Sequence, residues 1–162
     1  MVKIGKRSCD LMVYAHQSKT SISNLSDSII SHILSFLPIK DVIATSVLSK
    51  QWRFIWRQVP TLIFRLTDEE EPDAFVKFVY RVLLFSKSEI LQKFKVDWWT
   101  SDAGGTGFQD VNIWIDHVIA RNVRELDIEV NLDRNEEDIK RYVLTNLFTC
   151  GTLESLRYMG LF

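Results

Sequence analysis

Residues 22–60, ISNLSDSIISHILSFLPIKDVIATSVLSKQWRFIWRQVP, decide how the first part of this 162-residue chain folds. One continuous face of a helix with 3.6 residues per turn would carry five apolar side chains: Ile29, Ile30, Ile33, Leu34 and Leu37. Ser26 is a suitable N-cap for this helix, and Pro38 ends it. The pattern therefore predicts a short amphipathic helix over residues 26–37.

Two more short helices are predicted after Pro38. The segment from Asp41 to Leu48 carries four apolar residues, namely Val42, Ile43, Val47 and Leu48. Residues 50–59 carry a stripe at helical spacing made of Trp52, Ile55, Trp56 and Val59. Residues 24–60 are thus predicted to be three short helices. A unit of about 40 residues is small for burying its own core, so many of its apolar residues should face a partner.

The rest of the chain alternates helices with strands. An acidic stretch, residues 68–73, precedes a helix at 73–86, and it lacks the spacing and the glycine of a calcium loop. Three segments then share an apolar pattern: Leu91-x-x-Phe94-x-Val96, Val123-x-x-Leu126-x-Ile128 and Leu153-x-x-Leu156-x-Tyr158. Helices are expected between them, at 110–120 and 136–148. We therefore expect parallel strands joined by right-handed crossovers, as in a leucine-rich repeat. The alternative is a plain α/β layer.

Composition and charge exclude several classes of protein. Hydrophobic residues make up 46% and charged residues 25%, as in soluble globular proteins, and no apolar run is long enough to cross a membrane. The first twenty residues lack a secretory signal, and two cysteines make no disulfide framework, so we expect an intracellular protein. The net charge of −1 combines +6 over residues 1–65 with −7 over residues 66–162, which favours an acidic partner for the N-terminal part.

Catalytic, metal and cofactor chemistry is not expected. His16, His32 and His117 are scattered, and no His-x-x-x-His, Cys-x-x-Cys or Gly-x-Ser-x-Gly spacing occurs. The loop at 104–107 lacks the ending of a phosphate loop. Basic residues among the tryptophans of residues 50–57 could bind nucleic acid with salt-sensitive affinity, but the acidic remainder would repel phosphates. We therefore expect neither nucleic-acid nor membrane binding.

Residues 22–60 resemble an F-box, of the plant type that precedes leucine-rich repeats. The matching residues are Leu25, Asp27, Ile30, Ile33, Leu34, Phe36, Leu37, Pro38, Lys40, Asp41, Thr45, Ser46, Leu48, Ser49, Lys50, Trp52, Arg53 and Trp56. Trp114-Ile115, the VRELDI strand and the LFTCGTLESL stretch are similar to the same plant proteins. The expected fold is α+β: a mobile arm (1–21), a three-helix F-box (22–65), an acidic loop and linking helix (66–90), and an incomplete leucine-rich-repeat region with parallel strands (91–162).

The resemblance implies a non-catalytic substrate receptor of a Skp–cullin–F-box ubiquitin ligase, in the nucleus or cytoplasm. The F-box would dock on a Skp-type adaptor, and through it on cullin and RING proteins, while the repeats recruit an unknown protein substrate. The adaptor-binding residues would be Leu25, Ser26, Ile29, Ile30, Ile33, Leu34, Leu37, Pro38, Val42, Val47, Leu48 and Trp52. The alternative is a truncated F-box protein that binds the adaptor without recruiting substrate.

Three departures from the family pattern bear on this function. Leu25-Ser26 stands where the family usually has Leu-Pro, and Gln51 stands where it usually has Arg. The missing proline should lower affinity for the adaptor without unfolding the F-box. The sequence also stops at Phe162 with no polar capping repeat, so the strand near Leu156 is expected to be an open apolar edge that self-associates or frays beyond about Thr149.

Overall fold

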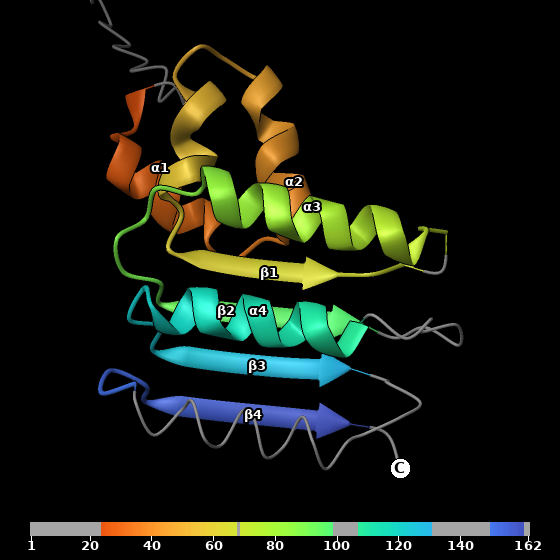
Figure 1. Ribbon diagram of the computed structural model, residues 1–162. Helices are drawn as coiled ribbons and strands as arrows, with labels where there is room; N and C mark the ends of the chain where they lie inside the picture. Colours follow the sequence, from red (N-terminus) through yellow and green to blue (C-terminus); the bar gives the residue numbers. More distant parts are fainter. Residues whose placement is uncertain (1–23, 68, 99–106, 131–149, 161–162) are drawn as a thin grey trace, which may run out of the picture.

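The computed structural model describes residues 24–67, 69–98, 107–130 and 150–160 (Figure 1). Its helices and strands are, in chain order, α1 (Asp27–Leu34), α2 (Ile39–Ala44), the 3₁₀-helices η2 (Thr45–Val47) and η3 (Trp52–Gln58), β1 (Thr61–Arg65), α3 (Pro72–Phe85), β2 (Lys93–Trp98), α4 (Gly107–Ile119), β3 (Glu125–Val130) and β4 (Ser155–Gly160). The predicted α+β class is therefore confirmed. The predicted arm at 1–21 and the helix predicted at 136–148 lie outside the described residues.

The four strands form one parallel sheet in the order β1-β2-β3-β4. The predicted strands near Phe94, Leu126 and Leu156 pair in that order, and their residues align across the sheet. Leu62 of β1 aligns with Phe94 in the same way. Strand β1 was not predicted, because residues 61–65 were assigned to the F-box. These five residues pair with β2 and complete the sheet.

Helices α3 and α4 cover one face of the sheet, as Figure 1 shows. The alternation predicted from the sequence is present in β2, where Phe94, Val96 and Trp98 are buried. Trp114 of α4 packs against Trp98 with ring centroids 5.6 Å apart, and Phe75 of α3 contacts both rings. Aromatic pairs at these distances add to the apolar area that they bury. The core between the sheet and its helices is therefore largely aromatic at this end.

The helical unit differs in two details from the prediction. Ser26 stands at the N-cap position of α1 with φ −68° and ψ 153°, but its side chain makes no capping hydrogen bond. Its Oγ instead lies 3.0 Å from Oγ of Ser28. The third predicted helix is a 3₁₀-helix, η3, and is shorter than residues 50–59. This tightly wound helix ends at Gln58, because the next residue, Val59, is already extended (φ −64°, ψ 124°) and leads into β1.

The helical unit and the sheet share one apolar core, which runs from Ile30 and Leu34 of α1 through Val59 to the strands. Lys40 of α2 adds a polar contact, since its Nζ pairs with Glu70 and lies 5.6 Å from the ring centroid of Phe78. The shared core explains why these short helices are ordered, because a unit of this size buries little by itself.

Paired isoleucines on α4 test this packing. Ile115 is fully buried, whereas Ile113 on the same helix is 52% exposed. We expect Ile115→Ala to lower the free energy of unfolding by about 2–5 kcal/mol, because it leaves a cavity in the core. The control, Ile113→Ala, should cost under about 1 kcal/mol. Urea unfolding followed by tryptophan fluorescence measures both, and equal losses would contradict the packing of α4.

Candidate partner-binding surfaces

The F-box region exposes many large apolar side chains. In order along the chain they are Ile29 (49% exposed), Ile33 (43%), Phe36 (71%), Leu37 (38%), Val47 (85%), Leu48 (64%) and Phe54 (57%). They lie on α1, on the turn after it, in and after η2, and on η3. Scattered exposed apolar residues are ordinary, but seven within 26 residues of a small unit indicate a surface that another molecule covers.

Helix α1 shows how this surface arises. Ile30 and Leu34 point into the core and are at most 1% exposed. Ile29 and Ile33 are also four residues apart, so they form a second apolar row beside the buried one. A helix that is apolar on both sides is typical of a helix buried on both sides. Packing within the described residues accounts for only one of the two rows.

The predicted adaptor-binding residues fall into three groups in this structure. Six are exposed: Ser26, Ile29, Ile33, Leu37, Val47 and Leu48. Two are half-buried: Leu25 and Pro38. Four are in the core: Ile30, Leu34, Val42 and Trp52. Adaptor binding by any of them stays a prediction, and the four core residues are placed to support the surface from beneath.

Two exposed aromatic residues were not among the predicted binding residues. Phe36 lies in the turn after α1, with its ring centroid 5.2 Å from that of His32. Phe54 lies on η3 under the guanidinium of Arg53, 5.5 Å from the ring centroid. Phe36 follows Ile33 by three residues, and this spacing could have added it to the outer row of α1. No comparable signal marks Phe54, whose exposure depends on how η3 packs.

Gln51 is one of the two residues that depart from the family pattern, and it bonds to the residues on both sides of the other one, Ser26. Its side-chain amide nitrogen donates hydrogen bonds to the carbonyl oxygen of Leu25 at 3.0 Å and to Oδ1 of Asp27 at 2.9 Å. It thereby fixes the start of α1 against the start of η3. The amide of Gln51 thus supplies the donors that this carbonyl and carboxylate accept.

The open face of the sheet, opposite α3 and α4, is the second surface. Lys95 lies at its centre, with Nζ 3.0 Å from Asp97 Oδ1, 3.2 Å from Asp127 Oδ2 and 3.0 Å from Glu129 Oε1. Burial by itself would lower the pKa of Lys95, but hydrogen bonds to the three carboxylates outweigh it and raise the pKa. The exposed charges around this network, each more than half exposed, are Arg65, Glu125 and Arg157.

Removing the central cation should destabilise this face. In Lys95→Met the three carboxylates remain close together with side chains at most 17% exposed, so we expect a loss of about 3 kcal/mol at pH 7. The matched control is Lys93→Met. The ion pair of Lys93 with Glu125 is far more exposed, so this change should cost under about 1 kcal/mol. Urea unfolding at pH 7 measures both losses, and equal losses in the two variants would contradict the network.

Other kinds of site find little support in the described part of the chain. It contains no cluster of three or more side chains placed to hold a metal ion. None of its helices has the length and apolarity needed to cross a membrane. An apolar hollow of about 240 Å³ lies between α3 and α4, lined by Tyr80, Leu83, Leu84, Ile113, Trp114 and His117. Beside it, burial and a hydrogen bond to Asp110 raise the pKa of Tyr80 to about 12.

Comparison with known proteins identifies the class to which the apolar surface belongs. Residues 22–64 match the F-box domain family. The chain is 41% identical over 141 residues to a protein of Arabidopsis thaliana named as an F-box/FBD/LRR-repeat protein. It is 34% identical over 140 residues to F-box/LRR-repeat protein 13, and 37% identical over 138 residues to another F-box/LRR-repeat protein, both from the same plant. Residues 22–64 thus match the F-box that the sequence indicated, and the chain is similar to plant proteins named for an F-box and leucine-rich repeats.

These alignments cover most of this chain but only part of each relative. They span 83%, 86% and 83% of this chain, and 30%, 30% and 42% of the three relatives in the same order. The shared part thus extends beyond the F-box into the linking helix and the parallel sheet. No solved structure matches the chain.

Proposed function

We propose that the chain acts as a substrate-receptor subunit of a Skp–cullin–F-box ubiquitin ligase. The observation that carries the proposal is the surface of seven exposed apolar residues, which lies within the region that matches the F-box domain. In this role the F-box docks on a Skp-type adaptor, which links it to cullin and RING proteins.

The charge of this region supports an acidic adaptor. Lys50 and Arg53 are exposed beside the apolar residues Leu48 and Phe54. Complementary charges at the rim of an interface mainly accelerate association, while the buried apolar centre supplies the affinity. The apolar residues of α1 and η2 would then set the dissociation rate, and the basic residues the dependence of association on salt.

The open face of the sheet is the proposed place for substrate. Its strands are parallel and aligned, so each adds one row of side chains to the face. Arg65 and Arg157 stand exposed on the two outer strands, whereas the carboxylates between them are occupied by Lys95. The chain spans about a third of its relatives, so this face is one part of the corresponding surface in those proteins.

The proposed role needs no catalytic group in this chain. A receptor that holds a substrate beside a ubiquitin-charged enzyme raises the effective concentration of the substrate's lysines. The chemistry then belongs to the other subunits.

Replacement of Leu37 and Pro38 by alanine tests the adaptor surface. Leu37 is 38% exposed and Pro38 is half-buried between α1 and α2, so the change removes apolar area within the proposed interface. We expect the Kd for a purified Skp-type adaptor to rise by at least about 30-fold, as for interface hot spots. Isothermal titration calorimetry measures this change.

Leu84→Ala is the matched control for that experiment. Leu84 is 74% exposed but lies on α3, outside the proposed interface. It should leave the Kd unchanged. The proposal fails if the unaltered chain does not bind the adaptor at micromolar concentration, and the fold would stand in that case.

Ser26→Pro tests whether the family departure weakens adaptor binding. The φ of −68° at Ser26 is already that of proline, so the change introduces no strain at this residue. The ring restricts the chain before binding, and we expect adaptor binding to tighten by about 0.5–1 kcal/mol. Ser26→Ala is the control and should not tighten binding. Calorimetric affinities that are equal or weaker in the proline variant would count against this effect.

A further inference from the structure

Arg121 is a half-buried cation whose charge is not neutralised within the described residues. It lies between α4 and β3, directly before Asn122, whose φ of 54° is left-handed, as at many helix ends. Nη2 of Arg121 donates to Oγ of Ser86 at 3.1 Å and to the carbonyl oxygen of Ser88. Both acceptors are neutral. Nη1 is buried and has no hydrogen-bond partner in the described part of the chain.

Among the residues that the structure describes, none supplies a carboxylate that compensates Arg121. Burial lowers the pKa of Arg121, and no carboxylate of the described residues counteracts this shift. Holding a guanidinium away from water without an anion costs free energy. A group that supplied negative charge and hydrogen-bond acceptors at this point would therefore be stabilised.

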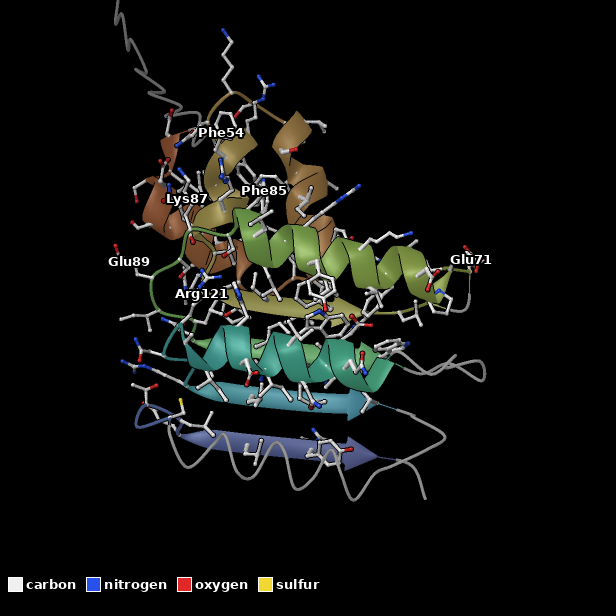
Figure 2. The ribbon with its side chains drawn as sticks, in the orientation of Figure 1. Phe54, Glu71, Phe85, Lys87, Glu89 and Arg121 are labelled. Carbon is white, nitrogen blue, oxygen red and sulfur yellow. The ribbon has the colours of Figure 1, made fainter. Side chains whose placement is uncertain are left out.

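The loop after α3 carries further positive charge. The amide nitrogen of Lys87 donates to the carbonyl oxygen of Arg57 at 2.6 Å, and Nε of Arg57 donates to the carbonyl oxygen of Phe85 at 2.9 Å. The Arg57 guanidinium also lies 5.8 Å from the ring centroid of Phe85. Figure 2 shows Lys87, Glu89 and Arg121 on the side of the molecule where this loop passes α4. Within the loop, only Glu89 is acidic.

We propose that Ser86 is a phosphorylation site whose phosphate is held by Arg121. The hydroxyl of Ser86 already lies within hydrogen-bond distance of Nη2, so a phosphate on it brings acceptor oxygens next to the guanidinium. A phosphate carries between one and two negative charges near neutral pH and accepts two parallel hydrogen bonds from arginine. The buried Nη1 would then gain the partner that it lacks.

The modification is an ordinary kinase reaction. Oγ of Ser86 attacks the γ-phosphorus of ATP, the bond from that phosphorus to the bridging oxygen breaks, and ADP leaves. The hydroxyl proton passes to a base of the kinase. The loop suits this access, since its neighbouring residues Lys87, Glu89 and Ile90 are exposed.

A phosphate here would brace the junction between the F-box and the sheet. The loop is bonded to η3 through Arg57 and to the turn before β3 through Arg121. Phosphorylation strengthens the second of these attachments. It would thereby stiffen the loop that joins α3 to β2.

Ser88 offers a matched control in the same loop. Its Oγ donates to the carbonyl oxygen of Ile90 at 2.8 Å, and only its main-chain carbonyl faces Arg121. A phosphate on Ser88 therefore starts from a hydroxyl that does not contact the guanidinium. The two sites share the loop and the nearby charge, and they differ in the contact with Arg121.

The test uses the full chain with phosphoserine installed at position 86 or at position 88. We expect ³¹P NMR titration to give a phosphate pKa at Ser86 about one unit below the usual value near 6, and a smaller shift at Ser88. Phosphoserine at 86 should raise the Tm by about 2–4 °C or more. Arg121→Gln should abolish both effects, and Arg121→Lys should retain part of them.

Mass spectrometry of the chain expressed in plant cells completes the test by locating phosphate on the peptide that contains Ser86. Equal phosphate pKa values at the two serines would overturn the role of Arg121, and that comparison needs no variant that might fail to fold. A Tm gain that persists in Arg121→Gln would do the same. Absence of phosphate from Ser86 in the cell-derived chain would overturn the assignment as a modification site.

Discussion

The passage of the chain from η3 directly into β1 is the constraint on which the rest of the structure depends. Only Val59 and Pro60 separate these two elements, so the F-box cannot pack independently of the sheet. Val59 is fully buried and belongs to the same core as Ile30 of α1 and the strand residue Leu62. A three-helix unit of this size would be only marginally stable alone, so its stability depends on packing against the sheet.

This shared core decides which residues remain for a partner. The inner row of α1 and Val42 of α2 are used against the sheet side, which leaves the outer row and the η2 region uncovered. Val42 is fully buried, whereas Val47 is 85% exposed. The two valines lie on different sides of the same short helical stretch. The proposed adaptor surface is therefore a consequence of docking the helices on β1, since the docking uses up one face of each helix.

Polar contacts fix the orientation that the core permits. Lys40 pairs α2 with the loop before α3, Arg57 bonds η3 to the end of α3, and Arg121 bonds the turn after α4 to the loop after α3. These contacts attach the helical unit and the loop after α3 to the elements that cover the sheet. In the proposed receptor role such attachments matter, because the effective concentration of substrate at an enzyme depends on geometry as well as on affinity.

The sequence by itself determined α1, α3, α4 and the three strands from β2 to β4, because their apolar periods are local and strong. It also indicated the parallel order, since the repeats recur every 30 to 32 residues. Tertiary structure alone decided β1, whose five residues become a strand only by pairing with β2. It also decided the exposure of Phe54 and the uncompensated charge of Arg121. Both depend on which distant segments come together, and no local pattern records that.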